Sequence, residues 1–179
     1  MTLILDTPRL QLVAYEPAHL LALMEGDGQF AQTFGVAPAE GLGAFFQSPD
    51  VSPDWVARLR ASTHGDPWLH GFAVVGRAEQ LVIGTVGFKG PPNEHGEVEI
   101  AYGVAPQFEN RGYATEATVA GAEFAFGNDA VERVIAHTKP EHNASGRVLE
   151  KCGFLRIGEV IDPEDGLVWR WELPRRVPG

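Results

Sequence analysis

Residues 109–114, Glu-Asn-Arg-Gly-Tyr-Ala, have the composition and the setting of a phosphate-binding turn. They follow an apolar, strand-like run over residues 98–104 and lead into a helical run from Thr115 to Phe126. The free backbone N–H groups of a first helical turn point at a bound anion, and the helix dipole adds partial positive charge there. A strand, a glycine turn and a helix are also ordinary α/β architecture, so the motif alone leaves both interpretations open.

Three residues in this turn favour the phosphate interpretation. Gly112 and Ala114 are small enough to let a phosphate approach the backbone closely. Arg111 can add a cation. The turn is therefore a candidate binding site for a phosphorylated ligand.

Two carboxylates, Glu97 and Glu99, precede this turn on the strand-like run. Residues two apart in a strand project from the same face, so the two side chains should lie close together. Like charges at that distance raise the pKa of one group, which favours a general base working near neutral pH. The alternative is a pair of solvated carboxylates on an exposed face, and it applies more to Glu97 than to Glu99.

The sequence lacks the patterns of other site chemistries. His64, His70, His95 and His137 have no metal-ligand spacing, so we expect no metal. Neither a Gly-x-Ser-x-Gly elbow nor a Gly-x-x-x-x-Gly-Lys-Ser/Thr loop occurs. The single cysteine, Cys152, excludes an internal disulfide, and we expect it to be a small core residue.

Length and composition predict one domain over residues 1–179. The chain is 44% hydrophobic and 21% charged, which is ordinary for a globular protein with a sizeable core. The formal net charge of −10 argues against nucleic-acid binding, which needs a basic patch. That charge suits a cationic amine substrate, although solubility is the simpler explanation. No 18-residue apolar run and no basic-then-apolar leader occurs, so we expect a cytoplasmic protein that does not bind a membrane.

Periodicity and turn residues place the elements that would position these groups. Predicted strands cover residues 9–15, 68–75, 81–88, 97–104, 133–138, 154–160 and 167–173, and predicted helices cover 17–24, 54–61, 115–126 and 143–152. Asn143 is the expected N-cap of the last helix and Gly153 follows its end. Residues 26–53 read as loops and a short helix. The fold class is α/β, with about seven strands, three of them successive and antiparallel, and about four helices.

Residues 112–117, Gly-Tyr-Ala-Thr-Glu-Ala, closely resemble the pyrophosphate loop and helix start of the GNAT N-acetyltransferase superfamily, in its RimJ/RimL-type branch. The superfamily pattern is Gln/Arg-x-x-Gly-x-Gly/Ala. Gly112 and Ala114 match it, whereas Glu109 and Asn110 depart from it. The opening residues 6–12 and residues 142–154 also resemble this branch. Its members acetylate protein N-terminal amines and related substrates.

The resemblance implies the GNAT fold, a mixed, mostly antiparallel sheet in which strands four and five splay apart and the pantetheine of acetyl-CoA lies between them. In the family, backbone N–H groups at a bulged end of strand four polarise the thioester carbonyl, and the matching residues here are Tyr102, Gly103 and Val104. The implied binding loop comprises Asn110, Arg111, Gly112, Tyr113, Ala114 and Thr115. The family's cofactor-binding Asn falls on His142, so either His142 or Asn143 takes over that contact.

Acetyl transfer to an amine needs a base for the amine, donors for the oxyanion and a proton for the thiolate. Glu99 falls on a Glu of the branch's Glu-Ile-x-Tyr strand, and we expect it to act as the base through an ordered water. The Tyr that many family members use as the acid is replaced by Leu149. Ser145 falls on a Ser of the branch that can hydrogen-bond the sulfur and relay a proton. An ordinary helix cap is the alternative role for Ser145.

The implied function is transfer of an acetyl group from acetyl-CoA to a primary amine by direct attack. A protein N-terminus is the first candidate acceptor, and a polyamine, amino acid or antibiotic is the second. A non-catalytic module that keeps the acyl-CoA cleft is the alternative from another class. The acceptor wall falls within residues 26–67, where Phe45, Phe46 and Trp55 serve either that wall or the core. Family members are often monomers or dimers, so we expect a monomer or homodimer.

Overall fold

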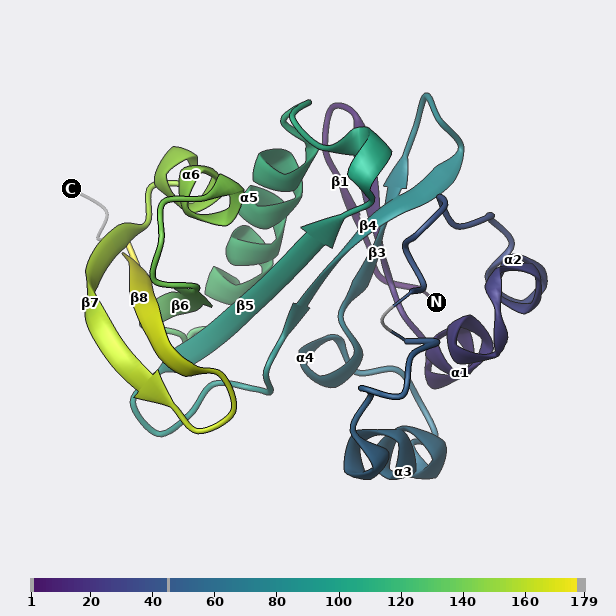
Figure 1. Cartoon of the computed structure of the whole chain (residues 1–179), viewed down its shortest axis with the longest axis horizontal. Coiled ribbons are helices and arrows are strands. Elements are labelled where there is room, and N and C mark those ends of the chain that lie inside the picture. Colours follow the sequence, from purple (N-terminus) through teal and green to yellow (C-terminus); the bar gives the residue numbers. More distant parts are fainter. Residues whose placement is uncertain (1, 45, 177–179) are drawn as a thin grey trace.

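A mixed sheet of eight strands organises the chain (Figure 1). The computed structural model describes residues 2–44 and 46–176. The strands are β1 (Ile4–Asp6), β2 (Leu10–Ala14), β3 (Phe72–Gly76), β4 (Leu81–Phe88), β5 (Glu97–Val104), β6 (Arg133–Thr138), β7 (Leu155–Asp162) and β8 (Gly166–Pro174). The helices are α1 (Pro17–Glu25), α2 (Asp27–Phe34), α3 (Pro53–Ala61), α4 (Pro67–His70), α5 (Tyr113–Phe126) and α6 (Ala144–Lys151), with a 3-10 turn over Pro106–Phe108.

Within the described residues, the strands lie in the order β1-β2-β3-β4-β5-β6-β8-β7. Each neighbouring pair is antiparallel except β5 and β6, which are parallel. The predicted α/β class with a mixed, mostly antiparallel sheet is therefore confirmed. The sheet gains an eighth strand because residues 4–6 pair with residues 11–13 at its edge.

α4 accounts for most of the remaining difference from the predicted elements. The strand predicted from Trp68 begins only at Phe72, because α4 comes first. Asp66 caps that helix by accepting a hydrogen bond from Trp68 N at 2.9 Å, and Pro67 occupies its first turn. α2 is the short helix expected after Gly26. The cap of α6 is as predicted, with Asn143 in the capping role.

Helices cover the two faces of the sheet unequally. α5 packs on the face formed by β2, β4, β5 and β6. α1, α2 and α3 cover the opposite face of the amino-terminal strands, where Phe30 and Leu59 are buried with Ala73 and Val75. Because side chains alternate along a strand, the face of β5 turned away from α5 carries its charged residues. The core of the molecule therefore lies mainly between α5 and the middle of the sheet.

β5 and β6 pair over only three residues. Residues 97–99 of β5 lie opposite residues 133–135 of β6, and beyond them β5 pairs with β4 as far as Val104. The sheet therefore splits between the carboxyl-terminal halves of β5 and β6. β5 and β6 correspond to the fourth and fifth predicted strands, so the split between them confirms the predicted splay.

The hydrogen-bond pattern of β5 determines which backbone groups face this split. Ala105 N donates to Ile83 O at 2.8 Å, so the odd-numbered residues of β5 bond to β4. The N–H groups of Tyr102 and Val104 therefore point away from β4, toward the side from which β6 has separated. The bulged strand end that the family resemblance implied for residues 102–104 is absent, because β5 keeps a regular register against β4 to its end. The split itself, rather than a bulge, frees these donors.

Close contact between α5 and the sheet depends on Gly121. A Cβ atom at this position would lie 2.7 Å from Val86 Cγ1 and 3.1 Å from Ile100 Cδ1. We expect Gly121→Ala to lower the free energy of unfolding by about 1–2 kcal/mol through overpacking, as measured by urea denaturation. Gly28→Ala in α2 is the matched control, because no atom lies within 4 Å of that Cβ position. It should leave stability unchanged or raise it by up to about 1 kcal/mol, and equal effects of the two substitutions would contradict this packing account.

Candidate functional site

A cavity of about 440 Å³ opens in the split between β5, the start of α5 and α6. We call it the splay cavity. It is lined by Tyr102, Gly103, Val104, Phe108, Glu109, Asn110, Gly112, Tyr113, Ala114, Thr115, Ala144, Ser145, Arg147, Val148 and Lys151. Most of the predicted site residues are among them, although they come from three separate stretches of the chain.

The start of α5 presents unpaired backbone donors to the splay cavity. Gly112 precedes the helix with a φ of +82° and has no side chain to cap it, and Asn110 has a φ of +62°. These left-handed conformations make a tight turn between β5 and the helix. The N–H groups of Tyr113, Ala114 and Thr115 remain available, and with the helix dipole they favour an anion.

Two cations of α6, Arg147 and Lys151, also line the splay cavity. Residues four apart in a helix lie on the same side, so both side chains serve the same wall. Their positive charge complements the donors at the start of α5. Sequence reasoning missed them, although their spacing in a predicted helix next to the phosphate turn was a usable signal.

Arg9 holds the phosphate turn from the other end of the chain. Its Nε lies 2.8 Å from Glu116 Oε1, and its Nη1 donates to the backbone oxygen of Arg111 at 2.9 Å. Its guanidinium also lies 4.3 Å from the centre of the Tyr113 ring. The Arg111 side chain lies over the Phe108 ring instead and does not line the splay cavity. The structure therefore does not place Arg111 as the predicted cation.

Arg9 and Glu116 form an ion pair that fixes the phosphate turn, and we call this pair the clamp. Glu116 accepts hydrogen bonds from the Thr7 hydroxyl and from the backbone and side chain of Arg9. Burial opposes its ionisation, but these hydrogen bonds hold the pKa of Glu116 below its usual value. The contact joins residues 107 positions apart, so it could not be read from local spacing.

Tyr102 reaches from β5 to α6. Its hydroxyl donates to the backbone oxygen of Ser145 at 2.9 Å, and burial raises the pKa of this phenol. The cap of α6 is Asn143, whose Oδ1 accepts from Gly146 N at 2.9 Å. Ser145 is therefore not the helix cap, and its exposed side chain lies at the edge of the splay cavity.

His142 and Asn143 do not line the splay cavity. The His142 ring packs edge-on against Trp169, with the ring centres 5.1 Å apart. Asn143 lines a neighbouring cavity of about 600 Å³, but its side-chain oxygen already caps α6. The structure thus keeps both residues out of the splay cavity, although Asn143 shares the neighbouring cavity with Tyr102 and Ser145.

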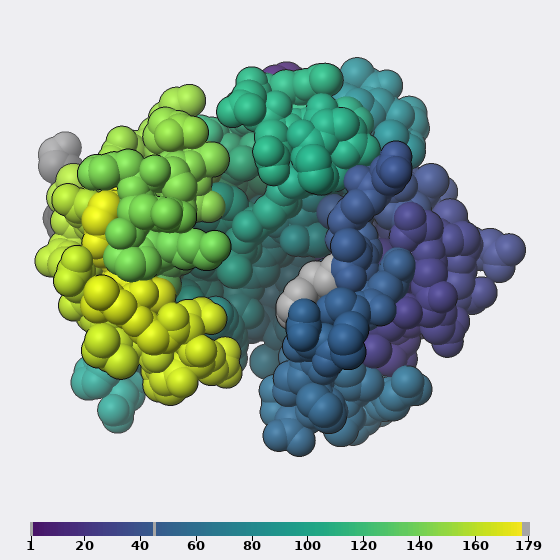
Figure 2. All heavy atoms as spheres, viewed as in Figure 1, coloured from purple at the N-terminus to yellow at the C-terminus, as the bar shows by residue number. Residues whose placement is uncertain are grey.

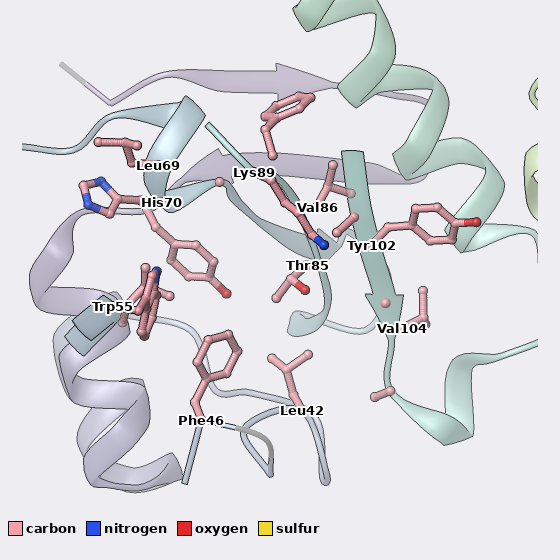
Figure 3. Close-up of a pocket in the computed structure, with 18 of the residues that line it drawn as sticks. Leu42, Phe46, Trp55, Leu69, His70, Thr85, Val86, Lys89, Tyr102 and Val104 are labelled. Carbon is pink, nitrogen blue, oxygen red and sulfur yellow. The ribbon is translucent and has the colours of Figure 1, made fainter. Parts of the chain in front are cut away.

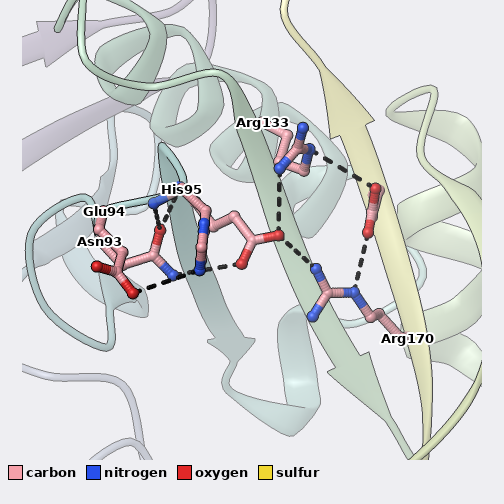
Figure 4. A network of polar contacts seen from close by, with 7 residues as sticks. Asn93, Glu94, His95, Arg133 and Arg170 are labelled. Atoms are coloured by element: carbon pink, nitrogen blue, oxygen red, sulfur yellow. Dashed lines mark hydrogen bonds and ion pairs between the residues drawn. The ribbon is translucent and has the colours of Figure 1, made fainter.

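Glu97 belongs to a network of ion pairs (Figure 4). Its Oε2 lies 2.7 Å from Arg170 Nη2 and 3.3 Å from Arg133 Nη1, and its Oε1 accepts from Asn93. Burial opposes ionisation, but Asn93 and the two arginines lower the pKa of Glu97. The idea that repulsion between the paired carboxylates raises a pKa therefore does not hold for Glu97. Its role is to join β5, β6 and β8.

Glu99 has different neighbours. Its Oε2 lies 3.0 Å from Lys89 Nζ and its Oε1 lies 3.2 Å from His137 Nδ1. His137 is partly buried, and apart from this contact with Glu99 its two buried ring nitrogens have no hydrogen-bond partner within the described residues. Glu99 and His137 line the neighbouring cavity of about 600 Å³ together with Tyr102 and Ser145. The predicted base and acid therefore share one cavity wall, and sequence reasoning missed His137 and Lys89 as partners.

A third cavity, of about 400 Å³, lies on the other side of the end of β5 (Figure 3). We call it the cleft cavity. It shares Tyr102, Gly103 and Val104 with the splay cavity. Phe46 and Trp55 line it and also pack against a core cluster, so neither predicted alternative is excluded for them, whereas Phe45 lies outside the described residues. The splay cavity and the cleft cavity thus meet at the end of β5, which carries the free N–H groups.

Other chemistries receive no support from the described residues. No group of three or more His, Cys, Asp and Glu side chains there could hold a metal ion. Cys152 is partly buried, and burial raises the pKa of its thiol to about 11, which does not suit a nucleophile. No helix in the described part of the chain has the length and hydropathy to span a membrane.

Comparisons with known proteins agree with this fold. The acetyltransferase (GNAT) domain family matches residues 9–155. The Bacillus subtilis (strain 168) protein named "Uncharacterized N-acetyltransferase YjdG" is 25% identical over 154 residues, which cover 85% of this chain and 89% of that protein.

Solved structures share the fold. Ribosomal-protein-S5-alanine acetyltransferase from Vibrio fischeri superposes with a TM-score of 0.65 and 15% identity, covering 96% of each chain. Aminoglycoside acetyltransferase AAC(6')-Ib in complex with coenzyme A gives a TM-score of 0.62 and 18% identity, covering 93% of this chain and 95% of that one. At these identities the likeness concerns the fold.

The clamp on the phosphate turn predicts a pH-dependent contribution to stability. A carboxylate whose pKa is lowered on folding stabilises the protein above its unfolded-state pKa, and that contribution is lost as the pH falls through the folded-state pKa. We expect Glu116→Gln to cost about 1–2 kcal/mol at pH 7 and progressively less below about pH 4, as measured by urea denaturation. Glu123→Gln, an exposed change on the same helix, is the control and should have little effect at either pH. A constant difference between wild type and Glu116→Gln from pH 7 to pH 3 would refute the clamp.

Proposed function

The chain belongs to the GNAT acetyltransferase family and is an N-acetyltransferase, and on that basis we propose that its substrates are acetyl-CoA and a protein N-terminal amine, as in the RimJ/RimL-type branch. One observation carries this proposal. The uncapped start of α5 and the free N–H groups of β5 open on the splay cavity, and the cleft cavity meets it at the same strand end. The site therefore offers one compartment for each substrate and a common boundary for the reaction.

The residues of the splay cavity suit the cosubstrate. The N–H groups of residues 113–115 are donors for a pyrophosphate, and Arg147 and Lys151 supply positive charge nearby. The remainder of the cavity runs along β5, where a pantetheine amide could pair with backbone that β6 has left unpaired. When bound, acetyl-CoA supplies a thioester whose carbonyl carbon accepts the amine.

The reaction divides among four groups. The amine nitrogen forms a bond to the carbonyl carbon, and the carbon–sulfur bond breaks. In our proposal the N–H groups of Tyr102 and Val104 stabilise the negative oxygen, since both face the cavity. Glu99 takes the amine proton through a water molecule, and the Ser145 hydroxyl relays a proton to the departing thiolate. The products are the acetylated amine and coenzyme A.

The open cleft supports a polymeric acceptor. Figure 2 shows a hollow on this face of the molecule, between the β7–β8 hairpin in yellow and the segment around α3 in blue. The cleft cavity lies in this region and reaches the surface at Leu69, which is 53% exposed. An N-terminus can enter such a cavity while the rest of its chain stays outside. The relatives with this fold act on different amines by name, so the fold does not select the acceptor.

The proposed base gives the most direct test of catalysis. We expect Glu99→Gln to lower kcat by about 10²-fold or more toward a peptide acceptor, because it removes the proton acceptor. The affinity for acetyl-CoA, measured by calorimetry, should stay within about twofold. The assay follows release of the coenzyme A thiol with a panel of short peptides and with small amines.

Glu97→Gln is the matched control for this test. It lies two residues away on the same strand face, but its carboxylate pairs with Arg133 and Arg170. It should keep kcat within about threefold of wild type. Full kcat in Glu99→Gln would exclude Glu99 as the base. Absence of thiol release by the wild type with every peptide and amine would overturn the enzymatic function itself.

A further inference from the structure

The cleft cavity has an unusual balance of polar and apolar groups for a site that must receive an amine. Its walls include buried Tyr15, Leu20, Val86 and Phe88, together with the more open Leu42, Phe46, Trp55 and Leu69. Phe46 and Trp55 pack together with ring centres 5.9 Å apart. In Figure 3, Leu42, Phe46 and Trp55 approach the cavity from one side, opposite the strands that carry Thr85 and Val104. The wall facing the reacting strand is therefore mainly aromatic and aliphatic.

None of the described residues that line this cavity is an aspartate or a glutamate. Its ionisable side chains are Tyr15, Tyr102, His70 and Lys89. His70 accepts a hydrogen bond from Asp66 N through Nδ1, and burial lowers the pKa of its imidazole, so it is neutral at pH 7. Lys89 carries a positive charge. Glu99, 3.0 Å from Lys89 Nζ, offsets this charge, so a second cation on an acceptor would find no unpaired carboxylate in the lining of the cavity and would lose its hydration there without compensation.

The nearest carboxylates line adjoining cavities or accept hydrogen bonds outside the cleft cavity. Glu99 is held by Lys89 at 3.0 Å and lines the neighbouring cavity, not this one. Glu164, in the turn between β7 and β8, lines an adjoining cavity that shares Phe46, Trp55 and Leu69 with the cleft cavity, and Asp165 lines the cavity that contains Glu99. Glu16 accepts a hydrogen bond from Gly65 N. The net charge of −10 attracts any amine to the protein, but it does not place a carboxylate in this cavity.

One polar atom in the cavity wall lacks a partner. The Tyr15 hydroxyl is buried and makes no hydrogen bond within the described residues. A buried hydroxyl without a partner is costly, and a bound molecule that offers a carbonyl would relieve that cost. The first peptide carbonyl of an N-terminal residue has this chemistry. The hydroxyl oxygen can also accept a hydrogen bond from an amine N–H, so this atom suits a peptide backbone but does not by itself discriminate against a polyamine.

We propose that the cleft cavity selects an N-terminal residue with an apolar side chain and discriminates against acceptors that carry a second positive charge. The apolar side chain packs on Leu42, Phe46, Trp55 and Leu69, and burial of that surface supplies the selectivity. The inference rests on the proposed function, because it assigns the acceptor of the same site. It makes polyamines and aminoglycosides poor substrates of this protein.

The test compares heptapeptides that differ only in their first residue, Phe or Lys, together with spermidine. Thiol release with acetyl-CoA should give a kcat/KM at least about tenfold higher for the Phe-first peptide than for the Lys-first peptide or spermidine. Leu69→Glu should narrow or reverse this ratio, because it puts a carboxylate at the mouth of the cavity. Leu155→Glu is the matched control, since Leu155 is 67% exposed on β7 and lines none of the three cavities described here. It should leave the ratio unchanged.

A higher kcat/KM for spermidine or the Lys-first peptide would overturn the inference while leaving the acetyltransferase function intact. If no acceptor released thiol, the proposed function would fail. The selectivity would then be tested by measuring the binding of the acceptors. Calorimetry with the coenzyme A-loaded protein would then compare the two peptides. Tighter binding of the Phe-first peptide supports the inference, and equal or weaker binding overturns it.

Discussion

The architecture of the site depends on the early end of pairing between β5 and β6. Parallel strands normally continue their ladder, yet here the pairing stops after three residues. Backbone donors that lose a strand partner must find another one. The split therefore creates both the space for a ligand and the N–H groups of Tyr102 and Val104 that face it. The first turn of α5 and two cations of α6 border the same opening. The interruption of the sheet therefore brings together the N–H donors and the positive charges that line the splay cavity.

The two glutamates of β5 show how position in the sheet decides chemistry. Glu97 and Glu99 share a strand face, but Glu97 lies where β5 and β6 are paired and β8 supplies Arg170. Its carboxylate forms ion pairs with Arg133 and Arg170, which hold the strands together. Glu99 lies at the last paired position, with Lys89 on one side and His137 on the other. It is the carboxylate next to the opening, and that placement, rather than repulsion from Glu97, is what recommends it for proton transfer.

Local signals in the sequence predicted much of this arrangement. The glycine turn before α5, the Asn143 cap and the order of strands and helices follow from short-range rules, and the structure has them. The errors were also local: Asp66 and Pro67 start a short helix where apolar residues suggested a strand, and a regular β5 replaces the expected bulge. The partners of the site could not be predicted, because Arg9 with Glu116 and Glu99 with His137 are brought together only by the folded sheet. The apolar character of the cleft cavity arises in the same way, from residues in α1, α3, α4 and the loops between them.

The most direct test of the account is a calorimetric titration with acetyl-CoA. Wild type should bind with a dissociation constant in the micromolar range, as small-molecule substrates commonly do. Gly112→Trp places a large side chain at the phosphate turn and should weaken binding at least about tenfold. Gly35→Trp is the matched control, because Gly35 also has a left-handed φ of +91°, lies at the end of α2 and lines none of the cavities described here. Loss of binding in the first variant alone is the predicted result, and equal binding by wild type and Gly112→Trp would contradict the assignment of the splay cavity.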